Sequence, residues 1–221
     1  MNQQTIIDAW ADMKPWVEGT LPGLARGTAI PNQVQDAGDI GACNAFNSPY
    51  GEQGGAVWGG DGNAAITLSA LTIATLSGVQ IQPATFIDAT TVRLPFNFSV
   101  LEVDGSYGYS QPCALYDMGH KTSHTTANGN GTITQRISNN NLAYIAKVGN
   151  GLTLSGLQVG GEPTITVNPG TGGLPGWIVA IGNFFSTFHE ADAMKSVVQD
   201  VFVGAGFSQT LIGLLNQKLR S

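Results

Sequence analysis

The sequence offers few side chains that could perform acid–base or metal chemistry. Three histidines are present, and Asp117, His120 and His124 fall close together. Two imidazoles four residues apart can bind zinc when they share a helical face. Gly119 and the Thr- and Ser-rich surroundings disfavour a helix here, and no cysteine or glutamate joins the group. An exposed polar loop explains these residues better than a metal site, so we expect no metal and no other cofactor.

Nucleophilic catalysis has equally few candidates. The sequence contains no Gly-x-Ser-x-Gly motif, which marks the nucleophile of many hydrolases. His189 stands beside Glu190 and Asp192 at the start of an expected helix, where acidic side chains complement the helix dipole. Helix capping explains these residues better than catalysis. We therefore expect no catalytic residues and no enzymatic activity.

Two glycine-rich segments are expected to be turns rather than ligand-binding loops. Residues 59–63 lack the carboxylate spacing and the closing glutamate of a calcium loop. Residues 129–132 are not followed by the Lys-Ser/Thr pair or the helix of a phosphate-binding loop. The second segment is therefore predicted to be the turn of a hairpin.

Charge is scarce throughout the chain. Lys, Arg, Asp and Glu make up 11% of the 221 residues, whereas about 25% is usual in soluble proteins. The hydrophobic share of 42% excludes a disordered chain. The net charge of -6 disfavours a nucleic-acid partner and polybasic docking on anionic lipid. No apolar stretch reaches the roughly 18 residues of a membrane-spanning helix, so a folded, weakly charged, mostly β or α+β protein is expected.

Cys43 and Cys113 leave two alternatives open. A disulfide between them would close a long loop and stabilise the fold by about 4 kcal/mol. The other alternative is a pair of buried thiols. The first residues lack the basic and apolar regions of a signal peptide, so we expect a cytoplasmic location or export by a non-classical route. Because disulfides are rare in the cytoplasm, this favours the thiols.

The N-terminal third changes from helical to irregular. Apolar residues recur at helical spacing at Ile6, Trp10, Met13 and Val17. Since Pro15 and Gly19 limit the element, we predict a short helix within residues 1–19. Residues 20–63 are rich in Gly, Pro and Asn and predict an irregular segment that hides some short strands.

Period-two alternation dominates residues 64–170 and predicts an antiparallel sheet. The longest alternating row carries Val92, Leu94, Phe96, Phe98 and Val100. Further strands are expected at residues 66–70, 79–82, 132–138, 142–148, 152–159 and 164–167. Turn signals stand at Ser77-Gly78, Asp104-Gly105 and Asn128-Gly129.

Residues 175–221 predict apolar helices. Aromatic and aliphatic residues recur at helical intervals after Pro175, and one helix is expected from about 191 to 219, roughly 40 Å long if unbroken. Gly204 and Gly206 predict a kink in it. The fold class is therefore α+β: a long curved antiparallel β-sheet wrapped around a long C-terminal helix, with a short N-terminal helix, all in a single domain.

The stretches 68–79, 92–98, 105–109, 152–159 and 183–219, in this order of elements, resemble the tubular lipid-binding superfamily. That superfamily includes juvenile-hormone-binding and Takeout-type proteins, group 7 mite allergens, bactericidal/permeability-increasing protein and bacterial members. The resemblance implies a curved sheet around a closing helix with an apolar tunnel between them. It also implies binding of a lipid without catalysis.

The C-terminal segment carries more aromatic surface than one helical stripe must bury. Core packing explains any single residue, but the whole set fits a tunnel, because each buried CH₂ contributes about 0.8 kcal/mol and uncharged walls cost no charge desolvation. We predict binding or carriage of a lipid or other hydrophobic small molecule. The expected lining is Val79, Ile81, Leu94, Phe96, Phe98, Leu152, Leu154, Trp177, Ile181, Phe185, Val198, Phe202 and Ile212.

Two other functions fit the same sequence. The uncharged Ser-, Thr-, Asn- and Gly-rich alternation of residues 63–87 and 122–141 would suit strands that contact a membrane within a secreted toxin complex. The same β face would also suit a structural or adhesive module with a protein partner or a second copy of the chain. Leakage from liposomes would distinguish the toxin, and stable self-assembly would distinguish the adhesive module.

Overall fold

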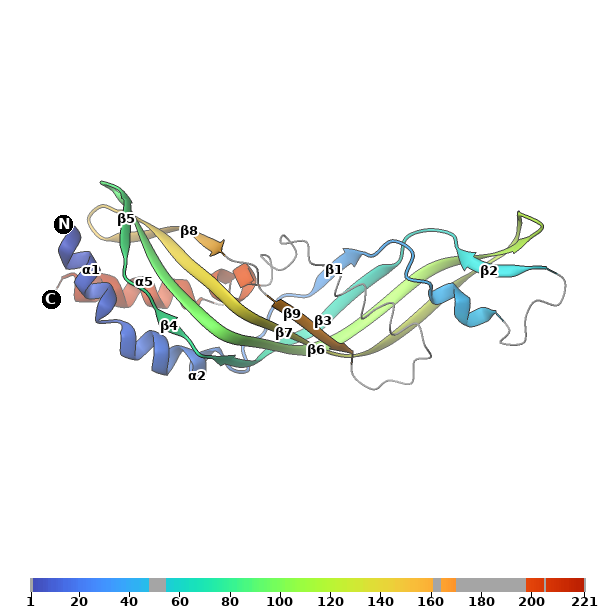
Figure 1. Cartoon of the computed structure of the whole chain (residues 1–221), viewed down its shortest axis with the longest axis horizontal. Coiled ribbons are helices and arrows are strands. Elements are labelled where there is room, and N and C mark those ends of the chain that lie inside the picture. The colour runs from blue at the N-terminus through green and yellow to red at the C-terminus, as the bar shows by residue number, and fades with distance from the viewer. Residues whose placement is uncertain (1, 48–54, 161–163, 170–197, 205, 221) are drawn as a thin grey trace.

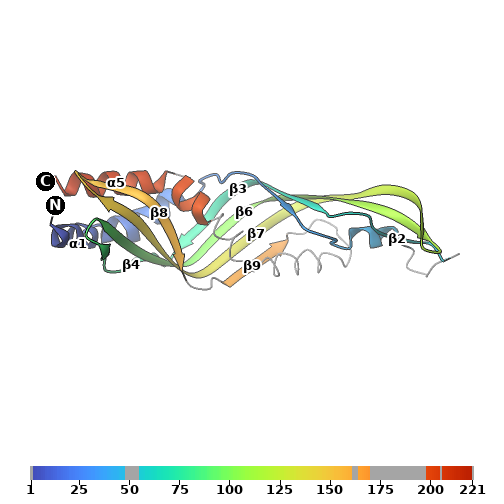
Figure 2. The same cartoon turned by 90° about the horizontal axis from the view of Figure 1, so that it is seen from above.

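The computed structural model describes residues 2–47, 55–160, 164–169, 198–204 and 206–220. The molecule is elongated, with α1, α2, α5 and both chain termini at one end and the tip of a long β-hairpin, flanked by β2, at the other (Figures 1 and 2). A curled antiparallel sheet runs between the two ends. The class is therefore α+β, as predicted.

The N-terminal helical stretch is longer than predicted. It comprises α1 (Gln3–Ala11), a π-helical turn (Trp16–Thr20) and α2 (Leu21–Ala25), 23 residues from first to last. The expectation that Pro15 and Gly19 end the helix is wrong. Pro15 caps the π-helical turn, where a proline removes no intrahelical hydrogen bond. The helical backbone therefore restarts there and continues to Ala25.

One sheet contains every described strand. The strands before the hairpin are β1 (Gln33–Asp36), β2 (Val57–Gly60), β3 (Ala65–Ser77), β4 (Gln80–Ile81) and β5 (Thr85–Asp88). The hairpin strands β6 (Thr91–Asp117) and β7 (His120–Val148) are followed by β8 (Leu152–Gly160) and β9 (Thr164–Pro169). β2, β3, β4 and β5 pair with β6, β8 and β9 pair with β7, and β1 extends the sheet beyond β3. Two short strands thus lie in the irregular segment 20–63, as expected.

The β6–β7 hairpin runs the length of the molecule and contains two of the predicted turns within its strands. Its true turn is Met118-Gly119, with φ of 47° and 82°, as a two-residue hairpin turn requires. Asp104-Gly105 and Asn128-Gly129 lie inside β6 and β7, so the prediction of turns there is wrong. The turn predicted at Ser77-Gly78 is confirmed, because β3 ends at Ser77 and Gly78 has φ of 63°.

Glycine in mid-strand β7 makes room for aromatic rings. Gly129 pairs with Tyr109 and Gly131 with Tyr107 across the hairpin. A Cβ atom on Gly129 would lie 2.3 Å from the Tyr109 ring, and one on Gly131 would lie 2.8 Å from the Tyr107 ring. Each tyrosine ring therefore covers a bare stretch of backbone, and the Asn-Gly pattern here serves packing rather than a turn.

Substituting Gly129 by alanine is expected to destabilise the fold by about 1–3 kcal/mol, because the new methyl group displaces the Tyr109 ring. Chemical denaturation measures the loss. Gly156→Ala in β8 is the matched control, since a Cβ there meets nothing within 4 Å. Equal stability of the two variants would contradict this account of the glycine.

The C-terminal helix is shorter than predicted. Within the described residues it consists of helical residues 198–199, a π-helical turn (Asp200–Gly204) and α5 (Phe207–Lys218). Gly206 separates them with φ of 81°, which confirms the predicted kink, because this left-handed conformation favours glycine. Residues 191–197 of the expected helix lie outside the described residues. The sheet therefore curls against a described α5 of 12 residues rather than a single long rod.

Side-chain contacts fix α5 at the helical end. The Asn216 side chain accepts a hydrogen bond from the Leu152 backbone N–H (2.6 Å) and donates one to the Leu152 carbonyl oxygen (2.9 Å). Lys218 Nζ lies 2.9 Å from the Asp12 carboxylate, next to the end of α1. No helix among the described residues has both the length and the apolar character needed to cross a membrane.

Candidate functional site

Four aromatic side chains join the sheet to the C-terminal segment. Phe96 and Phe98 come from β6, Tyr144 from β7 and Phe202 from the π-helical turn before α5. Ring centroids lie 5.4 Å apart for Phe96–Phe202, 5.7 Å for Phe98–Phe202 and 5.3 Å for Phe96–Tyr144. The Tyr144 hydroxyl donates to the Phe202 carbonyl oxygen at 2.9 Å, and burial raises the pKa of Tyr144. These rings pack against one another and fill the space between them.

The structure brings the described part of the predicted lining to this same region. Eight of these residues belong to the buried core: Val79, Leu94, Phe96, Phe98, Leu152, Val198, Phe202 and Ile212. Ile81 and Leu154 are partly buried and pack against it. Trp177, Ile181 and Phe185 lie outside the described residues. Among the buried members, Phe96 and Phe98 both pack on Phe202.

An apolar crevice opens beside this core, between α1 and the β4–β5 segment. Its volume is about 230 Å³, and its lining is Ile7, Trp10, Ala11, Lys14, Ile81, Gln82, Pro83 and Ala84. Ile81 belongs to the predicted lining, whereas the others do not. The helical spacing of the sequence predicted that Trp10 lies on the apolar face of a helix. Nothing local in the sequence indicates that this helix, α1, faces residues 81–84.

Hydrogen bonds hold both walls of the crevice. Trp10 Nε1–H donates to the Gln82 carbonyl oxygen at 2.8 Å, which fixes the indole against the strand segment. Glu18 accepts from Lys14 Nζ and from the Ile81 backbone N–H, each at 3.0 Å. Desolvation opposes ionisation of Glu18, but these two hydrogen bonds outweigh it and hold the pKa of Glu18 below its usual range. The crevice is thus an apolar slot with one ion pair beside it.

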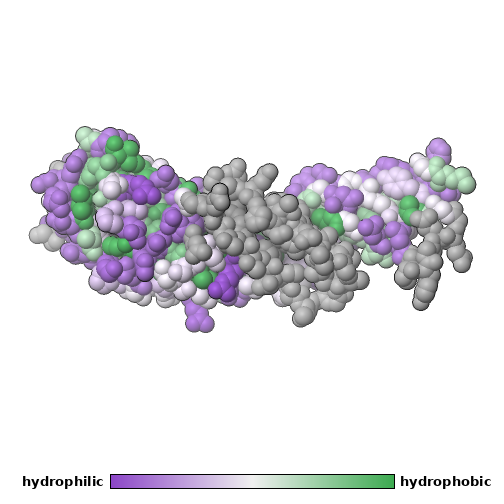
Figure 3. Space-filling model, viewed as in Figure 1, coloured by the Kyte–Doolittle hydropathy of each residue, from purple (hydrophilic) through white to green (hydrophobic). Residues whose placement is uncertain are grey.

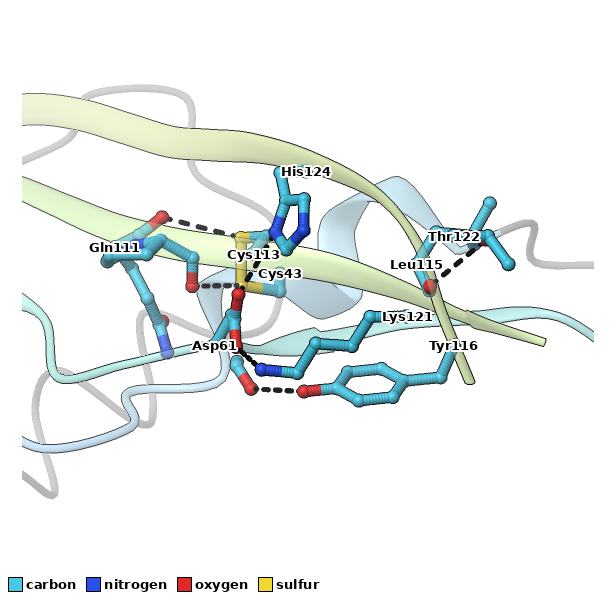
Figure 4. A network of polar contacts seen from close by, with 11 residues as sticks. Cys43, Asp61, Gln111, Cys113, Leu115, Tyr116, Lys121, Thr122 and His124 are labelled. Carbon is cyan, nitrogen blue, oxygen red and sulfur yellow. Dashed lines mark hydrogen bonds and ion pairs between the residues drawn. A yellow bond between two sulfur atoms is a disulfide. The ribbon is translucent and has the colours of Figure 1, made fainter. Parts of the chain in front are cut away.

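The opposite end of the molecule holds a disulfide between Cys43 and Cys113 (Figure 4). The expectation of two buried thiols is therefore wrong. Cys43 lies in a 3₁₀ helix (Ala42–Phe46) that packs on β6, which leaves the two Cα atoms 5.6 Å apart. Both cysteines are buried, so this tertiary contact, invisible in the sequence spacing, brings the sulfur atoms together.

The histidines predicted to be exposed lie near the hairpin turn. Asp117 ends β6 and His120 begins β7, and they pair across the turn. His124 Nδ1 lies 3.0 Å from Asp61, which also accepts a hydrogen bond from Lys121 (Figure 4). That hydrogen bond lowers the pKa of Asp61. Across the described ranges, no three His, Cys, Asp or Glu side chains gather closely enough to hold a metal. His189, Glu190 and Asp192 lie outside those ranges.

No protein family and no curated protein matches this chain by sequence. Among solved structures, the chain is similar to Takeout 1 from Epiphyas postvittana, with a TM-score of 0.46 and 10% identity over 89% of this chain and 87% of that chain. It is also similar to lipopolysaccharide binding protein, with a TM-score of 0.35 and 10% identity over 99% of this chain and 37% of that chain. The first of these two structures is a Takeout protein, the type of protein that the sequence was expected to resemble.

Proposed function

We propose that this protein binds a lipid or another hydrophobic small molecule at its helical end, in the crevice between α1 and the β4–β5 segment. The observation that carries the proposal is the apolar lining of that crevice. Ile7, Trp10, Ile81, Pro83 and Ala84 present hydrocarbon to it, and each CH₂ transferred from water to such a lining contributes about 0.8 kcal/mol.

The surroundings of the crevice support an apolar ligand. Trp10 and Ala84 belong both to its lining and to the hydrophobic core, so the crevice has an apolar floor. Figure 3 shows hydrophobic side chains reaching the surface at the helical end. The buried polar residues in the described part of the chain are uncharged: Thr91, Gln111, Gln135, Asn140 and Ser208. Lys14 is the charged side chain in the crevice lining, and it is 63% exposed, so a hydrocarbon chain here would not desolvate a buried charge.

Filling the crevice tests the proposal. Ala11 lines it but is exposed, so Ala11→Trp should fold while the indole occupies the slot. We expect at least a tenfold loss of affinity for N-phenyl-1-naphthylamine, a fluorescent hydrophobic probe, in a direct titration. Ala45→Trp, also exposed but at the disulfide end, is the matched control and should bind as the unsubstituted protein does.

Two outcomes would refute the proposal. One is undiminished probe binding by Ala11→Trp. The other is a purified protein that binds no probe and releases no lipid on organic extraction. Leakage of dye from phosphatidylcholine vesicles, measured in parallel, separates ligand binding from membrane permeabilisation, since a ligand-binding protein should leave the vesicles intact.

A further inference from the structure

One edge of the long hairpin lacks a neighbouring strand. β9 pairs with β7 from Ser138 to Ile133, and β8 pairs with it from Val148 to Asn141. Between the hairpin turn and Thr132, none of the described strands pairs with β7 on the side away from β6. The backbone N–H and C=O groups on that side therefore have no described strand to bond, and such an edge is a template for another strand.

The three longest strands are otherwise flanked on both sides. β3 has β6 on one side and β1 with residues 27–30 on the other, where the Ile30 N–H donates to the Leu71 carbonyl oxygen at 2.9 Å. β6 has β7 on one side and β2, β3, β4 and β5 on the other. The part of β7 next to the hairpin turn is therefore the exception among these strands.

The sequence of this edge does not protect it from pairing. Proteins block exposed edges with charges, prolines or bulges. β7 contains no proline, and residues 122–132 contain no Lys, Arg, Asp or Glu. The register with β6 shifts beside the turn and is then unbroken from Ser123 to Ser138. Every side chain from Lys121 to Thr126 is exposed, so an added strand would meet no covering side chains there.

One backbone acceptor of this stretch is bonded by a side chain of the same strand. Asn128 Nδ2 donates to the Thr126 carbonyl oxygen at 3.3 Å, which is longer than the usual 2.9–3.0 Å of such bonds. A carbonyl oxygen has two lone pairs. The bond therefore does not exclude a backbone N–H from an added strand.

The edge is complementary to itself. A two-fold axis relates identical surface patches, so it brings two copies of one edge strand together antiparallel. Pairing centred on Thr125 sets this threonine opposite its own copy, and cross-strand Thr–Thr pairs are stabilising. Lys121 then faces Gly129, and His124 faces Thr126. A second copy of the chain therefore meets no like charge along the edge.

The surroundings of the edge leave room for this arrangement. Centred on Thr125, the pairing uses residues 120–130 of each copy and stays clear of Pro169, where β9 ends opposite Ile133. Because the strands are antiparallel, each molecule extends beyond the hairpin turn of the other. That turn lies at the end opposite α1 and α5, so the two apolar crevices would lie at the far ends of the pair (Figure 1).

We propose that two copies of this chain associate through the open edge of β7, residues 120–130, as antiparallel strands about a two-fold axis at Thr125. The two sheets then form one continuous sheet, with about one backbone hydrogen bond for each paired residue. The crevice at the helical end takes no part, so this association goes beyond the proposed function and does not depend on it.

Sedimentation velocity tests the proposal. We expect a concentration-dependent equilibrium between monomer and dimer for the unsubstituted protein. Thr125→Lys should weaken the dimer at least tenfold, because like charges then meet at the two-fold axis, and Thr125→Glu should do the same. An equimolar mixture of the two variants should dimerise at least as strongly as the unsubstituted protein, since opposite charges then meet.

Thr75→Lys is the matched control. Thr75 is also an exposed threonine in a strand, but it lies in β3, opposite Glu102 of β6. This variant should dimerise as the unsubstituted protein does. Circular dichroism spectra and melting temperatures should be the same for the Thr125 variants and the control, because each substitution is at an exposed position.

Each other outcome would overturn the proposal. These outcomes are a monomer at every concentration, a dimer that both Thr125 variants retain, a mixture that does not restore association, and assemblies larger than a dimer. Binding of N-phenyl-1-naphthylamine should be the same for Thr125→Lys and the unsubstituted protein. Absence of probe binding by the unsubstituted dimer would refute the proposed function and leave the association intact.

Discussion

Replacing Phe202 by alanine is expected to lower the free energy of unfolding by about 3–5 kcal/mol. The Phe202 ring is 0% exposed and contacts Phe96 and Phe98. Its removal leaves a cavity among rigid aromatic neighbours that cannot collapse into the space. Because Phe202 belongs to the segment that precedes α5, the loss should also loosen the C-terminal helix from the sheet.

Equilibrium unfolding in urea measures this loss. Phe46→Ala is the matched control, since the Phe46 ring is 44% exposed and its aromatic contact is with Trp58 at the other end of the molecule. The control should lose less than about 1 kcal/mol. Similar losses for the two variants would show that the Phe202 ring is not part of a packed core.

Reduction of the disulfide is expected to lower the free energy of unfolding by about 4 kcal/mol. The bond joins residues 70 positions apart, Cys43 in the 3₁₀ helix and Cys113 in β6. Breaking it restores the conformational freedom of that long loop in the unfolded chain. Other contacts also tie the 3₁₀ helix to the sheet, among them the hydrogen bond from the Ala42 N–H to Gln111 Oε1 at 3.1 Å and the packing of the Phe46 ring on Trp58.

Urea unfolding with and without dithiothreitol measures the effect. The double variant Cys43→Ala/Cys113→Ala should unfold like the reduced protein and should not respond to the reductant. An unchanged midpoint on reduction of the unsubstituted protein would contradict the expected stabilisation. Detection of two free thiols by mass spectrometry, in protein that has not been reduced, would contradict the bond itself.

Local periodicity in the sequence predicted those helices and strands whose formation depends on residues close together in the chain. Alternation along residues 92–100 predicted the strand β6, and the helical spacing of Ile6, Trp10 and Met13 predicted α1, because burial of one face imposes its period on the sequence. The kink at Gly206 was also predictable, since a residue with φ of 81° is most easily glycine.

Turns were predictable only where a glycine adopts the positive φ that the turn requires. Gly78 does so, with φ of 63°, and the turn there was predicted. Gly129 and Gly131 instead leave room for the tyrosine rings of the opposite strand, so the Asn-Gly pattern there led to a wrong prediction of a turn. The actual turn, Met118-Gly119, has a methionine where Asn or Asp is usual, so its signal was weak.

By itself, the sequence determined a weakly charged α+β chain with a long antiparallel sheet and a C-terminal helix interrupted by glycine, since composition and periodicity reflect the burial and backbone conformation of each residue. Tertiary structure alone decided which distant segments meet. The disulfide and the crevice between α1 and Ile81 both arise from contacts between segments that are separate in sequence. Such contacts leave no local pattern, because a side chain that faces a partner 70 residues away has the same neighbours in sequence as one that faces solvent.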